Sequence, residues 1–456
     1  MSLTSLLSIA RGALLTQQGA INVTGHNIAN ANTPGFSRQR LAIAAAAPLQ
    51  TSFGQIGRGV TATGLERFRD QFLDASYRRE NGDLGRFTTQ NDVLSQVERA
   101  FGEPSDTGMG AGLDQLFAAF SDLANDPTSP TARTLARQAG ASLAQIFKDT
   151  DRRITDAVTL VQQKLTGVVS DINEIARQIA QLNTRIQGSG AGAREAPDVK
   201  DQRDMLVDQL SHLAGVRVIP HEDGTIGVLA GDVLMVDAGQ AATLELRDQG
   251  NGVLAVGIPN SSRALSFQSG EVAALTELSA TTLPALRTQL DALARGVVTE
   301  VNALHAGGRT LTGATGVNFF DPTGLTAASM QVSGDVQRST DNIAAGASGT
   351  PGDNSVALAI AGLRTSGVAS FGGRTLGESY QRLVGDLGAA VRDASRQQIA
   401  QDVVVSQAEE LRKSVSGVSI DEEMTSIIAQ QNAYAAAARL VNVADEMMRD
   451  VLAMVR

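Results

Sequence analysis

Histidines are the side chains of this sequence best suited to bind a metal or transfer protons. His26, His212, His221 and His305 are isolated in the chain, and none has a second histidine or a carboxylate at the spacing of a known metal motif. The segment His221-Glu-Asp-Gly224 has the composition of a hairpin turn. We therefore predict no metal site and no cofactor.

Other catalytic signatures are incomplete. Gly108-Met-Gly-Ala-Gly112 is not followed by Lys-Ser or Lys-Thr, so it predicts a flexible helix entry rather than a phosphate loop. Asp421-Glu-Glu423 is most simply a solvated helix start, because general acid-base catalysis by paired carboxylates would require burial to separate their pKa values. The sequence has no nucleophile elbow and no cysteine. We expect a protein that is not an enzyme; the alternative, an all-α enzyme or effector, would need a concave pocket with convergent polar groups.

Composition narrows the possible partners. The 456 residues carry a net charge of -10, and no cluster of Lys and Arg is present to neutralise phosphates, so we expect no nucleic acid. No run of about 18 apolar residues occurs, which argues against membrane insertion. The first residues lack the basic and apolar regions of a signal peptide, so we expect no signal cleavage.

Heptad spacing of apolar residues predicts long helices in three segments. The rod seam is the most regular and runs from Ile154 to Ile186, a rod of about 50 Å. The N-terminal seam consists of Leu3, Leu7, Ala10, Leu14, Gln17, Ile21, Thr24 and Ile28. The C-terminal seam consists of Ile420, Met424, Ile427, Gln431, Tyr434, Ala438, Val441, Asp445, Met448, Leu452 and Val455.

The remaining segments complete a mainly α fold. Shorter helices are expected at about 88–101, 113–125, 131–148, 199–213, 284–305 and 377–413, and the glycine-rich residues 188–193 should break the rod. Alternation in Val216-Arg-Val218 and Thr243-Leu-Glu-Leu246, with turns at Asp223-Gly224 and Asn251-Gly252, predicts β-hairpins.

We therefore predict a long antiparallel helical rod with paired terminal helices and an inserted β-rich middle domain. The terminal coiled-coil assembly domain comprises residues 1–50 with 416–456. The helical rod domain comprises 51–213 with 280–305 and 355–415. The β-rich middle domain comprises 214–279 with 306–354.

The terminal helices are expected to need neighbours. The few apolar seam residues of the N-terminal helix bury too little area to offset the ordering of about 26 residues. Pairing with the C-terminal helix still leaves flanks uncovered, and subunits side by side would close them. An ordinary internal bundle core remains the alternative, and it is the better interpretation of the rod seam.

A turn motif follows the first helix. Pro34 and Gly35 suit a type II turn, so the helix should end by about Asn32. Asn27-Ile-Ala-Asn30 followed by Thr33-Pro-Gly-Phe36-Ser-Arg-Gln39 resembles the N-terminal signature of flagellar rod, hook and hook-associated proteins. Phe36 stands where Tyr is common in that family. The asparagines are expected to form the turn, with contacts to neighbouring subunits as the alternative.

The Ser-Arg-Gln continuation is similar to the hook-associated protein 1 family, the first junction proteins between hook and filament. Ser416-Gly-Val-Ser-Ile-Asp-Glu-Glu423, with Gln431-Asn-Ala-Tyr434, resembles the C-terminal signature. Ser419 and Glu422 also have the spacing of a capping box. Lys200-Asp-Gln-Arg-Asp204, Asn302-Ala-Leu-His305 and Pro351-Gly-Asp-Asn354 look like the same family.

The resemblance implies a structural subunit of the bacterial flagellum at the hook-filament junction, assembled axially through its terminal helices. It implies self-association in a ring, contacts with the hook protein and the second junction protein, and a type III export chaperone. It also implies an extracellular location reached without signal peptide cleavage. The alternative is a hook or rod subunit, which should lack the 154–186 rod.

Overall fold

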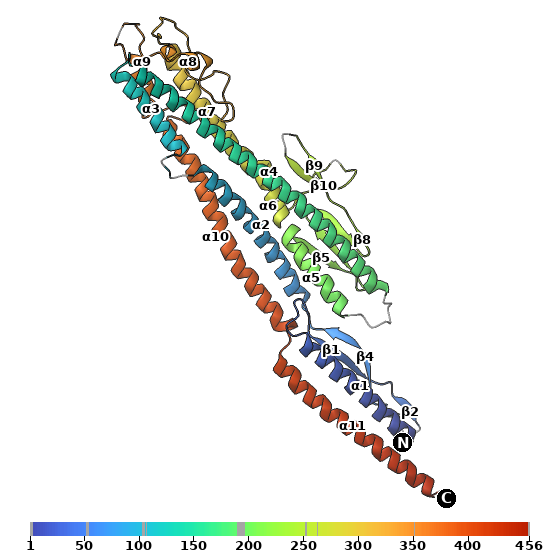
Figure 1. Cartoon of the computed structure of the whole chain (residues 1–456). Helices are drawn as coiled ribbons and strands as arrows, with labels where there is room; N and C mark the ends of the chain where they lie inside the picture. The colour runs from blue at the N-terminus through green and yellow to red at the C-terminus, as the bar shows by residue number, and fades with distance from the viewer. Residues whose placement is uncertain are drawn as a thin grey trace.

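The chain forms an elongated, mainly helical molecule (Figure 1). The computed structural model describes residues 3–51, 54–102, 105, 107–188, 197–250, 253–261, 263–350 and 352–454. Four predicted features lie wholly or partly outside these ranges: the glycine-rich break, the turn at Asn251-Gly252, the motif residue Pro351 and the seam residue Val455.

The helices and strands alternate along the chain in blocks. The α-helices are α1 Leu3–Ala29, α2 Gln71–Phe101, α3 Met109–Asn125, α4 Pro130–Gly188, α5 Pro197–Ala214, α6 Glu271–Glu277, α7 Leu283–Ala306, α8 Gly334–Arg338, α9 Ser355–Gly362, α10 Leu376–Ser416 and α11 Ile420–Met454. The strands are β1 Gln39–Ala45, β2 Leu49–Thr51, β3 Gly54–Ile56, β4 Val60–Arg67, β5 Val216–Pro220, β6 Ile226–Ala230, β7 Val233–Asp237, β8 Gln240–Ala241, β9 Glu245–Asp248 and β10 Leu254–Gly257. A π-helical stretch, η1 Leu278–Thr282, joins α6 to α7, and two short 3-10 helices are η2 Thr340–Asn342 and η3 Ala369–Phe371.

Helix α4 is the longest of the helices described and runs along the rod (Figure 1). Its 59 residues give a length of about 88 Å. The rod seam is buried along it, with Ile154, Leu165, Ile172 and Ile179 inaccessible to solvent, so this seam is an internal core as expected. Two helices were predicted here, at 131–148 and 154–186; the structure joins them, because no proline or glycine pair interrupts the turns between.

The segments predicted to form the β-rich middle domain lie in two separate parts of the molecule. Strands β5 to β8 form an antiparallel sheet, and Gly224 takes the positive φ of 82° that the predicted turn requires. The sheet lies against the C-terminal part of α4, where Asn183 Nδ2 donates to the carbonyls of Ile226 and Ala238. Strands β9 and β10 form a second hairpin.

Residues 306–354 pack at the opposite end of α4. The buried Arg133 donates to the carbonyls of Thr340 and Ile343. Arg133 and Asn183 are 50 positions apart on one helix, or about 75 Å. We therefore propose that 214–279 and 306–354, which were predicted to form one domain, are two units, because helix α4 holds the two segments apart.

Strands β1 and β4 were not predicted. They pair antiparallel, with Gln39 opposite Arg67 and Ala45 opposite Val60, and they pack beside α1. Because β4 belongs with β1, the terminal region extends past the predicted boundary at residue 50. We propose Arg67 as its limit.

The terminal helices α1 and α11 pair, as predicted, at one end of the rod (Figure 1). Helix α1 ends at Ala29, within the limit set by the turn motif. Only residues 417–419 separate α10 from α11. None of the helices described is long and apolar enough to cross a membrane.

Candidate assembly site at the terminal helices and their joint with the rod

The turn after α1 has the predicted geometry. Phe36 N donates to the Thr33 carbonyl across 3.2 Å, and Gly35 has a φ of 77°. Asn30 Nδ2 donates to the His26 carbonyl, and Thr33 Oγ1 donates to Asn30 Oδ1. Asn30 therefore forms the turn, as expected, and the turn reverses the chain toward α5.

Asn27 has a different role from Asn30. Its buried amide donates to the Gln39 carbonyl at 2.8 Å and accepts from Gln39 N at 3.0 Å. The same Nδ2 donates to Glu423 Oε2 at 2.9 Å. Asn27 therefore joins the end of α1, the start of β1 and the first turn of α11.

Glu423 corrects the prediction of a solvated helix start. Its side chain is buried, and its Oε1 accepts a hydrogen bond from Arg38 Nε at 2.7 Å. The Glu422 carboxylate, expected to close a capping box with Ser419, instead accepts from Arg38 Nη1 at 3.0 Å. Sequence spacing could not reveal this, because Arg38 comes from the other end of the chain.

The strongest polar cluster lies where the terminal pair meets the rod, and we call it the ionic joint. Its members are Arg67, Arg69, Arg78, Arg203, Arg412, Asp74, Asp201, Asp204 and Asp208. They come from β4, α2, α5, α10 and the residues between β4 and α2. Charged groups of this kind are retained in protein interiors when each has a partner.

Two chains of contacts run through the ionic joint. Arg67 Nη1 lies 2.7 Å from Asp201 and 3.0 Å from Asp204, which connects β4 to α5. Arg412 Nη1 lies 2.5 Å from Asp208, and its guanidinium stacks on Tyr77 at 3.9 Å, which connects α10 to α5 and α2.

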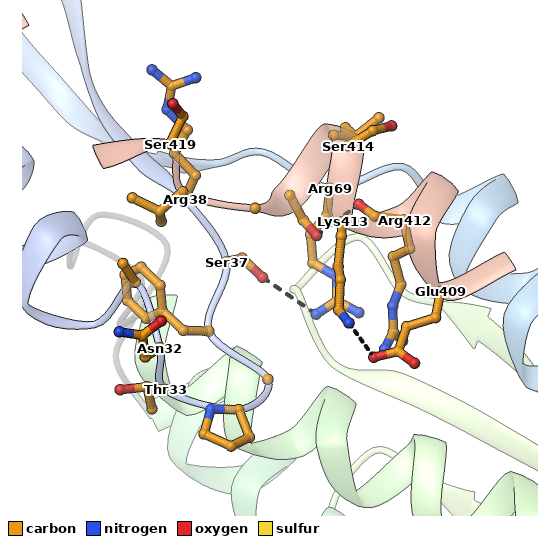
Figure 2. Close-up of a pocket in the computed structure, with 18 of the residues that line it drawn as sticks. Asn32, Thr33, Ser37, Arg38, Arg69, Glu409, Arg412, Lys413, Ser414 and Ser419 are labelled. Atoms are coloured by element: carbon orange, nitrogen blue, oxygen red, sulfur yellow. Dashed lines mark hydrogen bonds and ion pairs between the residues drawn. The ribbon is translucent and has the colours of Figure 1, made fainter. Parts of the chain in front are cut away.

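The turn motif is fastened to the same cluster through Ser37. Its N and Oγ donate to the Asp201 carboxylate at 3.0 and 2.7 Å. Figure 2 shows Ser37 facing Arg69, whose Nη1 donates to the serine hydroxyl. The segment following α1 is therefore fixed to the rod by directional bonds.

Burial and charge act in opposite directions on these carboxyls. Burial raises the pKa of Asp204, but the positive charges of Arg69, Arg67 and Arg78 outweigh it, so the pKa is lowered. For Asp201 burial prevails over Arg67 and Ser37, and the pKa is raised. Asp204 is accordingly the fixed anion of the joint.

A cleft of about 760 Å³ opens beside the joint (Figure 2). Its walls are the 31–38 turn, the end of α10 and residues 417–419. Lys413 and Glu409, which face each other in Figure 2, form an ion pair at 2.8 Å. The cleft's cations Arg69, Arg412 and Lys413 are thus paired with Asp74, Asp208 and Glu409.

The terminal seams lie only partly between α1 and α11. On α1, small side chains are the most buried, namely Ala10, Thr16, Ala20 and Thr24; on α11 these are Ala437 and Ala444. The predicted residues Leu3, Leu14, Ile21, Ile28, Ile427 and Val441 are half-buried, and Leu7, Ile420, Met424, Tyr434, Met448 and Leu452 are exposed. The large apolar residues thus flank the contact, and their role in assembly stays a prediction.

The histidines serve local structure. His305 is fully buried; its Nδ1 pairs with the Val317 carbonyl and its Nε2 accepts from Ala344 N. Burial lowers the pKa of His305 to about 4. His26 packs edge-on against Phe36, and His221 closes the β5–β6 turn as predicted. Within the described ranges, no three His, Cys, Asp or Glu side chains are grouped to hold a metal ion.

Comparisons with known proteins find flagellar proteins that are similar to this chain. The family described as "Flagellar hook-associated protein FlgK helical domain" matches residues 94–320. "Flagella basal body rod protein" matches 7–36, and "Flagellar basal body rod FlgEFG protein C-terminal" matches 413–454. Flagellar hook-associated protein 1 of Bacillus subtilis is 28% identical over 492 residues, covering 98% of this chain and 97% of the relative. The chain is therefore similar to flagellar hook-associated protein 1 over nearly its whole length.

Other similar proteins are also flagellar hook-associated or hook junction proteins. Flagellar hook-associated protein 1 of Salmonella typhimurium is 28% identical over 330 residues, which are 70% of this chain and 59% of the relative. The solved structure of the flagellar hook junction protein FlgK from Burkholderia pseudomallei has a TM-score of 0.67 at 17% identity. It covers 75% of this chain and 100% of its own, and it shows the same fold. The protein is a structural, flagellar hook-associated subunit, as the sequence analysis predicted.

The ionic joint was missed by the sequence analysis. The motif Lys200-Asp-Gln-Arg-Asp204 was noticed only as a family resemblance, yet three of its five residues are buried charges. The available signal was the placement of Asp201, Asp204 and Asp208 at helical spacing on one face of α5. Their partners Arg67 and Arg78 could not be found by spacing, because these arginines lie more than 100 positions away.

Proposed function

We propose that this protein forms the junction between the flagellar hook and the filament, and that α1 and α11 assemble axially with the terminal helices of neighbouring subunits. The proposed partners are further copies in a ring, the hook protein and the second junction protein. The protein is proposed to act outside the cell as a structural element and to have no catalytic activity.

The observation that carries this proposal is the uncovered surface of α11. Beyond its first turn, which Arg38 binds, the helix packs chiefly on α1, and Met424, Met447 and Leu452 are 47%, 49% and 63% exposed. A free soluble protein rarely leaves so many large apolar side chains along one helix in water. Neighbouring terminal helices are the partner for which such a surface is suited.

We further propose that α11 binds a type III export chaperone before assembly, since an exposed apolar helix requires cover inside the cell. Export would then proceed without cleavage of a signal peptide. A hook or rod subunit is the alternative, and the uninterrupted helix α4 favours the junction protein.

The test uses a flagellated host whose own junction protein is deleted. Leu14→Asp or Met448→Asp should leave the monomer folded, because neither side chain is fully buried, and should abolish filament growth by placing an unpaired charge between subunits. Leu358→Asp is the matched control, since Leu358 lies on α9 at the other end of the rod and is 53% exposed. Swimming cells carrying Leu14→Asp or Met448→Asp would refute terminal-helix assembly.

A further inference from the structure

Helix α10 has an outward face that changes character along its length. In its N-terminal half the exposed side includes the ion pairs Arg382–Asp386 and Arg396–Asp393. In its C-terminal half the outward side chains become apolar: Ile399, Val403 and Leu411 are 64%, 51% and 58% exposed. We call residues 399–415 of this face the α10 stripe.

The α10 stripe faces away from the rod. The opposite side of the same turns packs on α2, where Gln398 bonds to Asn91, Gln401 bonds to Glu80 and Val405 is buried. A shallow groove of about 640 Å³ runs along the stripe beside Val403 and Leu411. Nothing in the fold of one chain requires these side chains to be apolar.

A second apolar patch lies on the outer face of the sheet. Ile219 on β5 and Leu234 on β7 are 42% and 41% exposed. Gly227 lies between them: a Cβ at this glycine would be 3.2 Å from His221 Nε2, 3.5 Å from Leu234 and 3.6 Å from Ile219. The glycine is buried among these side chains, and we call Ile219, Gly227 and Leu234 the sheet patch.

The α10 stripe and the sheet patch lie on opposite flanks at the same level of the rod. Arg412 of α10 stacks on Tyr77 of α2. One turn away, Asp74 and Arg78 of α2 share a cavity with Val218 and Pro220 of β5. Helix α2 therefore separates the two surfaces, and Figure 1 shows α10 and the sheet at opposite edges of the molecule.

Charge is also complementary between the flanks. The groove along the α10 stripe is bordered by the carboxylates of Asp402 and Glu410. Beside Ile219 the exposed Arg217 has no hydrogen bond or ion pair with any residue that the structure describes. Acidic groups around one apolar surface and a cation beside the other favour a contact between the two.

We propose that the α10 stripe of one subunit docks on the sheet patch of the next copy of this chain. The contact is heterologous, and it gives a ring when the rotation that repeats it about an axis parallel to the rods closes. Val403 and Leu411 pack against the exposed side chains of Ile219 and Leu234, and Asp402 pairs with Arg217. The inference rests on the proposed assembly of copies in a ring, and it names the lateral surface that the terminal helices do not supply.

Cysteine cross-linking tests this contact, because the chain has no cysteine of its own. A Val403→Cys, Ile219→Cys double variant replaces the wild type in the flagellated host, and motility under reducing conditions confirms assembly. Isolated hook-filament structures are then treated with a short bis-maleimide, which tolerates thiols too far apart for a disulfide. The control is Leu358→Cys with Leu311→Cys, whose parent side chains are 53% and 50% exposed.

The expected result is a ladder of cross-linked species from the double variant, dimers from a mixture of the two single variants, and no ladder from the control pair. Dimers from Val403→Cys alone would show that the stripe meets itself and would overturn the proposal. Motile cells without any cross-link from the double variant would overturn it too, while the junction function would stand.

Charge reversal provides an independent measurement if the cysteine pair itself stops motility. Asp402→Arg and Arg217→Asp should each reduce the swarming rate, and the chain carrying both changes should recover it, because the ion pair is restored with reversed polarity. Additive losses in the double reversal would overturn the pairing. Failure of the terminal-helix variants described above to block assembly would instead count against the junction function.

Discussion

Asn27 donates a 2.9 Å hydrogen bond to Glu423, although the two residues lie 396 positions apart in the chain. The same carboxylate accepts from Arg38, so one buried anion connects the end of α1, the strand that follows and the start of α11. The direction in which the terminal pair leaves the rod therefore depends on a contact between the two ends of the sequence.

Replacing Glu423 with Gln should loosen this corner. The substitution removes a buried charge while Arg38 remains, which we expect to cost about 1–3 kcal/mol in the local opening free energy. Amide hydrogen exchange at residues 24–40 should accelerate accordingly. Glu422→Gln is the control: that carboxylate is 64% exposed and binds the same arginine, so about 0.5 kcal/mol or less is expected. Equal effects from both variants would contradict the role given to Glu423.

Helices α2 and α5 are predicted to tolerate no side chain at Gly85. A Cβ there would lie 2.2 Å from the His212 carbonyl oxygen, so Gly85→Ala must push the helices apart. We expect a loss of about 1–3 kcal/mol in unfolding free energy, measured by urea denaturation. Gly167→Ala on α4 has open space around it and should instead stabilise by about 0.5–1 kcal/mol. A stable Gly85→Ala variant would mean that α2 and α5 pack less closely.

Stability near the 306–354 loops should fall in mild acid because of His305. Its folded pKa is about 4, below the ordinary value of 6.5, so the unfolded chain binds a proton first as pH falls. The unfolding free energy should therefore decrease between pH 6.5 and pH 4 by roughly 3 kcal/mol from this group. The His305→Gln variant should show a shallower pH dependence over that interval. Parallel curves for variant and wild type would exclude His305 as the source.

The free monomer should exchange amide hydrogens unevenly. Residues 3–32 and 420–454 should exchange much faster than 154–186, because α11 packs chiefly on α1 while Ile154, Leu165 and Ile172 are buried in the rod core. Mass spectrometry of the purified protein measures this directly. Full protection at both ends would indicate a self-contained core and would favour an ordinary bundle.

Much of the helical fold could be predicted because its signals are local. The seam from Ile154 to Ile186 repeats every three and four residues without a break, and it is buried as expected. Strands β1 and β4 were missed because the signal that forms them is not local. The run Leu41-Ala-Ile-Ala-Ala45 has little β-branched content and no polar alternation, so its strand conformation depends on pairing with residues 60–67.

The terminal seams show a different limit of the method. Helix α11 carries apolar residues on several faces, and periodicity does not tell which face is inside one chain. The structure buries Ala437 and Ala444 against α1 and leaves Met448 and Leu452 accessible, because small side chains allow the two helices to approach closely. The pairing of charges in the ionic joint could not be predicted from spacing, since Arg67 and Asp201 meet only through the tertiary fold.

Helix α4 also has a mechanical consequence. Arg133 near its first turn holds the loops at one end, and Asn183 near its last turn holds the sheet next to the ionic joint. Between these two attachments runs one column of backbone hydrogen bonds without a proline. Because α4 is continuous over this distance of about 75 Å, a rotation applied at the ionic joint turns the whole helix, and both ends of the rod turn together.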